Sequence, residues 1–309
     1  MRHSIVFKPI LVGLSFLSIS SMAAPGKQDT MTEQQHLQNS VMLLRDQLGA
    51  LRAQKITRSC EKEHQHIWAG SEVKISWFYG YENHENKTYD RITSTALVRV
   101  LKQPCKPNDT VQACGFRQVS RVGHMTRLEK VVHGKAVKLN IYFSSLTNEE
   151  SQNADVEKKY WEQQERSRQV QRQFAHDLRH SDIVFYSGHS RGGAGPGFES
   201  QSAAQIGFNY LFRGPWRSNL RALQAPSNLK VFALFSCSSS KYYRKDIESV
   251  NPNISMILSH KEVSSDEAEQ AGIGALNAFL TKACASDVHN SMISNEEGDE
   301  RAMEYVLRR

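Results

Sequence analysis

Three short apolar runs in the second half of the chain constrain its fold more than any other feature. They are DIVFYSG at residues 182–188, LKVFALFS at 229–236 and NISMILSH at 253–260. Each has the length of one buried strand. Helical patterns accompany these runs near residues 215–225, 239–249 and 264–284. Buried strands that alternate with helices predict an α/β fold with a mostly parallel sheet, covered on both faces.

The same alternation begins near residue 136. AVKLNIYFSSL is interpreted as a strand, and residues 155–179 as a long helix with an apolar face. That face carries Val156, Tyr160, Val170, Phe174 and Leu178. In the last helical stretch, Ser265 and Asp266 are the predicted caps. We assign residues 136–290 to an α/β domain and residues 291–309 to a C-terminal tail.

Residues 24–135 have a different pattern, which predicts a helix plus a small antiparallel β region. Four short segments rich in β-branched or aromatic residues predict the strands: EVKISWFYGY, TSTALVRVL, CGFRQVSRVGH and TRLEKVVH. Ahead of them, Leu37, Val41, Leu44, Leu48 and Leu51 form an apolar seam at helical spacing. The seam predicts packing on its own domain, and a dimer through the 37–51 helix is the alternative.

The first 23 residues have the pattern of a signal peptide. Arg2, His3 and Lys8 form a positive region ahead of the apolar stretch PILVGLSFLSISSMA. The small residues Ser21 and Ala23 suit cleavage after Ala23. The stretch is short for a membrane span, so an uncleaved anchor is the weaker alternative. No Cys follows it to carry a lipid. We therefore expect an exported protein, periplasmic or secreted, with no stable membrane anchor.

Charge and histidine placement limit the classes of partner. The formal charge of +7 falls by two, to +5, when Arg2 and Lys8 leave with residues 1–23. The remaining basic residues are interspersed with acids, which is typical of solvated helix faces, so nucleic acid is not an expected partner. Five histidines are interpreted as surface residues whose spacing fits no metal site: His64, His66, His84, His124 and His133. We expect neither a metal ion nor a cofactor.

The chain has five cysteines, an odd number for a protein expected in an oxidising compartment. Cys105 and Cys114 flank the turn-rich loop KPNDTVQA and are predicted to pair. Cys60 and Cys284 then remain as a candidate long-range pair, and Cys237 as the free thiol. The alternative is that several of these cysteines are buried and reduced.

The segment GHSRG at residues 188–192 admits a serine-hydrolase interpretation. It matches the G-x-S-x-G nucleophile elbow, with Ser190 as nucleophile, and an elbow requires a helix directly after the Ser. The following RGGAGPGF instead holds four glycines and a proline, which cost about 1 and 3 kcal/mol each in a helix interior. We expect a mobile loop over the site instead. Triad partners are nominated only by their order in the chain: Asp246 or Asp266 with His260 or His289.

A cysteine interpretation fits the strand pattern better. His189 follows one predicted strand and Cys237 follows another. Because the carboxyl ends of parallel strands meet at one edge of a sheet, these side chains should reach a common substrate carbonyl. Imidazole supplies proton transfer and thiolate is a strong nucleophile. A buried Cys unrelated to a loop His is the alternative.

DIVFYSGH and KVFALFSC resemble the two catalytic strands of the caspase–legumain–gingipain clan of cysteine peptidases. The resemblance covers about residues 137–285 and is sharpest at 182–189 and 229–237. It implies a caspase-like α/β sandwich, His189 as proton-transfer catalyst and Cys237 as nucleophile. It also implies an oxyanion hole from the backbone amides of Ser190 and Cys237. In this chain, Ser190 stands where the clan has Gly, and Ser236 stands where it usually has Ala.

These features together predict an exported cysteine endopeptidase that acts on peptide or protein substrates. Arg191, beside the predicted dyad, is a candidate for contact with a carboxylate of the substrate, although solvent exposure is the commoner fate of arginine. The alternatives are a serine hydrolase that uses Ser190 and a non-catalytic binding module on a caspase-like scaffold.

Overall fold

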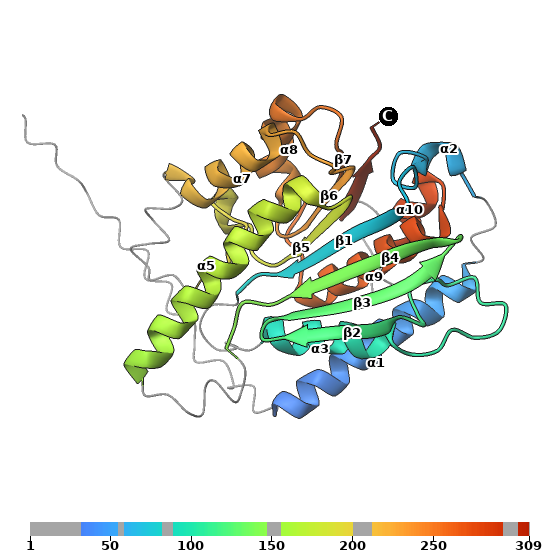
Figure 1. The fold of residues 1–309 in the computed structure, drawn as a ribbon, viewed down its shortest axis with the longest axis horizontal. Helices are drawn as coiled ribbons and strands as arrows, with labels where there is room; N and C mark the ends of the chain where they lie inside the picture. Colours follow the sequence, from blue (N-terminus) through green and yellow to red (C-terminus); the bar gives the residue numbers. More distant parts are fainter. Residues whose placement is uncertain are drawn as a thin grey trace, which may run out of the picture. The chain divides into compact units, whose positions relative to one another are not determined.

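An eight-stranded mixed sheet forms the centre of the protein in the computed structural model (Figure 1). The strands lie in the order β2-β3-β4-β1-β5-β6-β7-β8. Their bounds are β1 (Glu72–Tyr79), β2 (Arg117–Val122), β3 (Met125–Val132), β4 (Lys135–Tyr142), β5 (Ile183–Ser187), β6 (Val231–Phe235), β7 (Ser255–Ser259) and β8 (Met303–Val306). The pairs β4–β1, β1–β5, β5–β6 and β6–β7 are parallel. The predicted α/β fold with a mostly parallel sheet is confirmed.

The structure describes residues 32–54, 59–81, 89–146, 156–199, 212–292 and 302–308. The predicted signal peptide, residues 1–23, and His84 lie outside these ranges. Within them, no helix combines the length and apolar character needed to cross a membrane.

Helices cover both faces of the sheet (Figure 1). On one face lie α1 (Glu33–Ala53), α3 (Tyr89–Leu101), α9 (Ser265–Thr281) and α10 (Ala285–Ser291). On the other face lie α5 (Val156–His180), α7 (Gly214–Gln224) and α8 (Ser239–Val250). The short α2 (Glu61–His64) precedes β1. The helices predicted near 155–179, 215–225, 239–249 and 264–284 are therefore present.

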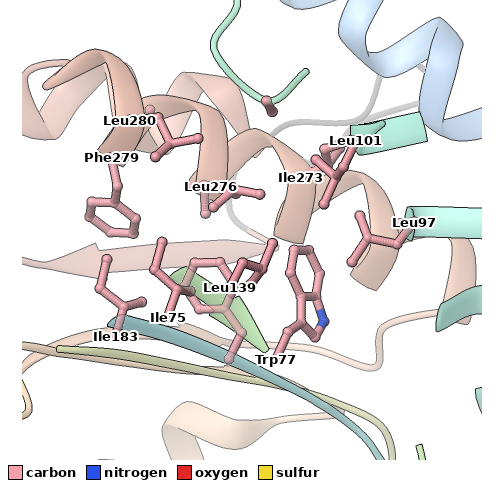
Figure 2. Close-up of a cluster of buried hydrophobic side chains, with 14 of the residues drawn as sticks. Ile75, Trp77, Leu97, Leu101, Leu139, Ile183, Ile273, Leu276, Phe279 and Leu280 are labelled. Atoms are coloured by element: carbon pink, nitrogen blue, oxygen red, sulfur yellow. The ribbon is translucent and has the colours of Figure 1, made fainter. Parts of the chain in front are cut away.

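Trp77 on β1 anchors the core between the sheet and α9. Its side chain is completely buried, and its indole Nε1 donates to Ser187 Oγ at 3.1 Å. Figure 2 shows the indole pointing from the sheet toward α9, beside Ile273 and Leu276. Gly272 of α9 leaves room for the ring, because a Cβ there would collide with the indole. This packing fixes the end of β1, where the strand reaches the candidate site.

Two predictions for the N-terminal half are wrong. TSTALVRVL belongs to helix α3, because Ala96, Leu97, Val100 and Leu101 recur with helical spacing and are all buried against the core. β1 is not antiparallel but lies between two parallel partners at the centre of the sheet. Its apolar run SWFY, buried on both faces, is typical of such a strand. Glu33–Arg309 forms one compact unit, and the expected boundary near residue 135 falls within its sheet.

The predicted seam on the first helix is used within the chain. Leu44, Leu48 and Leu51 of α1 are buried in the core, and Leu37 and Val41 pack against it. The predicted packing on its own domain is therefore confirmed, and this apolar seam is not available for a dimer.

Other predictions at the level of single residues need correction. The α9 cap is Ser264, which accepts from the Glu267 amide in a capping box, because Ser265 is already helical. His64 is completely buried rather than at the surface. Tyr160 is 53% exposed and is not part of the core cluster beneath α5. The expected C-terminal tail contributes β8, which pairs antiparallel with β7.

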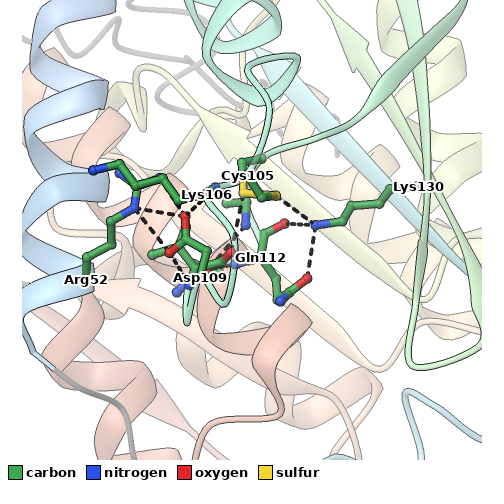
Figure 3. Close-up of a disulfide and its surroundings, with 10 residues drawn as sticks. Arg52, Cys105, Lys106, Asp109, Gln112 and Lys130 are labelled. Atoms are coloured by element: carbon green, nitrogen blue, oxygen red, sulfur yellow. Dashed lines mark hydrogen bonds and ion pairs between the residues drawn. A yellow bond between two sulfur atoms is a disulfide. The ribbon is translucent and has the colours of Figure 1, made fainter.

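The predicted disulfides are present, and Cys237 is the free thiol. Cys60–Cys284 joins the residue before α2 to the residue before α10, next to a bridge between Ser59 and Ala283. Cys105–Cys114 closes a short loop (Figure 3). Within that loop, the Asp109 carboxylate accepts from Arg52 of α1, and Lys130 of β3 donates to the Gln112 carbonyl at 2.9 Å.

Candidate active site

His189 and Cys237 follow two adjacent strands at the same edge of the sheet. β5 and β6 are parallel neighbours, and Ser187 at the end of β5 is paired with Phe235 at the end of β6. His189 lies two residues beyond Ser187, and Cys237 lies two residues beyond Phe235. The parallel register therefore brings the two predicted catalytic residues to one edge of the sheet.

Both residues line one cavity of about 90 Å³. Its walls come from the ends of β1, β5 and β6 and from the first turns of α3 and α9. The lining residues are Tyr79, Gly80, Tyr89, Asp90, Thr93, Ser187, Gly188, His189, Phe235, Cys237, Val263, Ser264, Ser265, Ala268 and Glu269. The volume suits one side chain of a ligand and is well below the roughly 300–1,000 Å³ of pockets that hold a whole small molecule.

Cys237 sits in a tight turn between β6 and α8. Its side chain is half-buried, and Sγ lies 3.6 Å from the Val263 carbonyl oxygen. Ser238 takes a left-handed conformation, with φ 49°, and its amide donates to the Lys261 carbonyl at 2.7 Å. Among the described residues, the Cys237 amide has no hydrogen-bond acceptor. The turn therefore places the Cys237 thiol at the cavity, together with a backbone N–H that has no acceptor among the described residues.

The segment that carries His189 is fixed by Tyr186 and two glycines. The Tyr186 hydroxyl lies 3.1 Å from the His189 carbonyl oxygen and accepts from the Gly197 amide at 3.1 Å. A Cβ on Gly188 would lie 2.7 Å from the same hydroxyl, and a Cβ on Gly80 would collide with it. Only glycine allows β1 and the end of β5 to approach the tyrosine this closely.

The glycine-rich loop after Ser190 is packed, not open. It contains a single 3-10 turn, Arg191–Gly193, so the predicted absence of a helix is confirmed. Residues 193–198 are buried, which does not fit the expected mobile cover. The Arg213 guanidinium donates to the Gly193 carbonyl at 2.8 Å, and the Tyr243 hydroxyl donates to the Ser190 carbonyl at 2.5 Å. These bonds attach the loop to α7 and α8.

Ser190 does not have the geometry of an elbow nucleophile. Its side chain is only 4% exposed, it has ordinary right-handed φ and ψ, and it does not line the cavity. An elbow serine is instead exposed on a strained turn. Two of the nominated partners bond elsewhere: Asp246 accepts from Trp216, and His260 pairs with Glu304. A third, Asp266, accepts from Tyr89 at 3.4 Å.

The Arg191 side chain bonds within its own loop. Its Nη2 donates to the Glu199 carbonyl at 2.9 Å, and Arg191 is not among the residues that line the cavity. The Ser190 amide, like that of Cys237, has no acceptor among the described residues. The described residues therefore offer no acceptor to either of the two amides named as oxyanion donors.

Glu269, a buried carboxyl group in the cavity, was not among the residues predicted from the sequence. It is 3% exposed, and one carboxyl oxygen accepts from the Tyr79 hydroxyl at 2.7 Å. Burial raises the pKa of Glu269 to about 8, although the bond from Tyr79 lowers it. Asp90, also buried there, accepts from the amides of Ser144 and Ser145, and burial raises its pKa.

No protein-family model, curated protein or solved structure matches the chain. In the described part of the chain, no group of three or more His, Cys, Asp or Glu side chains is arranged to hold a metal ion. The case for a function therefore depends on the chemistry of the cavity.

Proposed function

We propose that the protein is an exported cysteine endopeptidase in which Cys237 is the nucleophile and His189 transfers the proton. One observation carries the proposal: the free thiol and an imidazole follow adjacent parallel strands and line the same cavity. The resemblance of DIVFYSGH and KVFALFSC to the caspase–legumain–gingipain clan agrees with this assignment. So does the α/β sheet with helices on both faces.

The residues suffice for a balanced acyl-transfer reaction. Cys237 Sγ gives its proton to His189 and bonds to the carbonyl carbon, and the carbon–nitrogen bond breaks as His189 protonates the leaving amine. Water then attacks the thioester, gives a proton to His189 and releases the new carboxylic acid. The proton returns from His189 to the thiolate, so the protein ends the cycle unchanged.

The carbonyl oxygen becomes negative in each attack and needs hydrogen-bond donors. The amides of Ser190 and Cys237 are the candidates, because neither has an acceptor among the described residues and both adjoin the reacting side chains. Their use requires only backbone N–H groups, so Ser at position 190 can replace Gly without removing a donor.

Two features support export. Two disulfides persist best in an oxidising compartment, and residues 1–23 have the pattern of a signal peptide. A periplasmic or secreted peptidase is the form of the proposal that accounts for both.

The test is hydrolysis of a peptide library by the exported protein and three variants. Cys237→Ala and His189→Ala should each lower kcat/KM at least about 100-fold, the range for loss of a nucleophile or a proton-transfer group. Ser190→Ala is the matched control and should retain activity within about threefold, because only its amide is used. Circular dichroism should be the same for all four proteins.

Two results would contradict the proposal. Loss of activity in Ser190→Ala with none in Cys237→Ala would identify a serine hydrolase. No hydrolysis of any peptide, together with a Cys237 thiol inert to iodoacetamide, would identify a binding module.

A further inference from the structure

The cavity beside Cys237 has a lining that suits a long amphipathic side chain. Phe235, Val263 and Ala268 supply apolar surface, and Tyr79 and Tyr89 are the tyrosines of the lining. A chain of methylene groups can lie along the apolar part. Aromatic rings favour a cation beside their faces.

The charge of the lining is acidic. Glu269 and Asp90 are both more than nine-tenths buried and line the cavity, whereas none of the described residues that line it is Lys or Arg. Asp90 is held by three backbone amides and the Ser144 hydroxyl. Among the described residues, Glu269 has only the Tyr79 hydroxyl as a donor, and none of these residues donates to its other carboxyl oxygen. The carboxyl that can still accept a ligand is therefore that of Glu269.

We propose that this cavity binds the Lys or Arg side chain that precedes the scissile bond, with Glu269 as its counter-ion. The inference rests on the proposed peptidase function and names its substrate class. Cys237 and His189 lie at the same cavity, so a side chain inside it places the adjoining peptide carbonyl within their reach.

An acidic side chain does not suit this cavity, because it would meet two buried carboxyl groups. A neutral amide on a ligand could hydrogen-bond to Glu269. Glutamine at position 269 would bind such an amide equally well and would not bury a charge. A cation is the ligand for which a carboxyl is required.

Several titratable or charged groups surround Glu269: Tyr79 on β1, Tyr89 and Asp90 on α3, His189 after β5, Cys237 after β6 and Asp266 on α9. None of them is Lys or Arg. In the protein without a bound substrate, Glu269 is mostly protonated below pH 8, because burial raises its pKa to about 8. A Lys or Arg side chain therefore binds best once the carboxyl has lost its proton.

The first test compares peptide substrates that differ only before the scissile bond: Lys, Arg, citrulline, norleucine and Asp. We expect kcat/KM for Lys and Arg to exceed that for citrulline and norleucine by at least about 10-fold. Glu269→Gln should remove this preference while the neutral substrates are still cleaved. Glu262→Gln is the matched control, because Glu262 is an exposed acid just before α9 and does not line the cavity.

The second test needs no variant and covers the case in which Glu269→Gln does not fold. The ratio of kcat/KM for Lys over norleucine should rise by up to about tenfold per pH unit below 8 and level off above it. His189 and Cys237 act on both substrates, so their own titrations cancel in the ratio.

The outcomes separate this inference from the proposed function. Cleavage that depends on Cys237 but prefers a neutral or acidic residue, or a Lys preference that survives Glu269→Gln, would overturn the inference alone. A pH-independent ratio would also overturn it. No Cys237-dependent cleavage of any substrate would overturn both.

Discussion

The two disulfides should differ greatly in their contribution to stability, because they close loops of very different length. Cys60–Cys284 spans 224 positions and Cys105–Cys114 spans 9. The loop-closure entropy removed from the unfolded chain amounts to about 5 kcal/mol for the long loop and about 2.5 kcal/mol for the short one. The variants Cys60→Ala/Cys284→Ala and Cys105→Ala/Cys114→Ala should therefore differ by about 2.5 kcal/mol in free energy of unfolding.

Urea unfolding followed by circular dichroism measures this difference directly, and m-values show whether the unfolded states are comparable. The Cys60→Ala/Cys284→Ala variant, which lacks the long-range disulfide, should also lose about 10 °C in Tm. The hydrogen bond from the Cys60 amide to the Lys282 carbonyl, 3.0 Å long, uses only backbone atoms and can form in this variant. Equal losses in the two variants, or a larger loss from the short loop, would refute the reasoning from chain entropy.

Three further perturbations address the site. Gly188→Ala should lower kcat/KM about 100-fold, because its Cβ would press on the Tyr186 hydroxyl that holds the His189 segment; unchanged kinetics would exclude that role. Arg213→Ala should cost about 1–3 kcal/mol of unfolding free energy through loss of its bond to the loop, and an unaltered urea midpoint would contradict this. The pKa of Glu269 is raised to about 8 in the folded protein, so the folded state binds more protons than the unfolded state below that pH, and stability falls as pH rises toward 8. Glu269→Gln should therefore gain stability over the wild type as pH goes from about 5 to about 8, and a constant difference in Tm would be evidence against a buried, titrating carboxyl.

The sheet near the site could be predicted from local sequence alone. β5, β6 and β7 are predominantly apolar and all their residues are buried, so each short apolar run predicted a buried strand. Their parallel pairing followed from the helices between them. His189 and Cys237 could be placed together for the same reason, since both follow such strands.

Other features depend on contacts that no local pattern contains. The Thr and Val residues of α3 favour strands, but its buried face against the core makes it a helix. Glu269 lies in the second turn of α9, and its buried partner Tyr79 is 190 positions away in the sequence. Residues 303–306 form a segment too short to be identified as a strand without β7 beside it.

Covalent trapping of the nucleophile tests the central claim most directly. The exported protein would be incubated with a peptide acyloxymethyl ketone that ends in Lys, and the modified residue mapped by mass spectrometry. We predict one adduct, on Cys237, formed at least about 100-fold more slowly in His189→Ala than in the wild type. An adduct on Ser190, or modification of Cys237 at the same rate without His189, would contradict the assignment of these two residues as a catalytic pair.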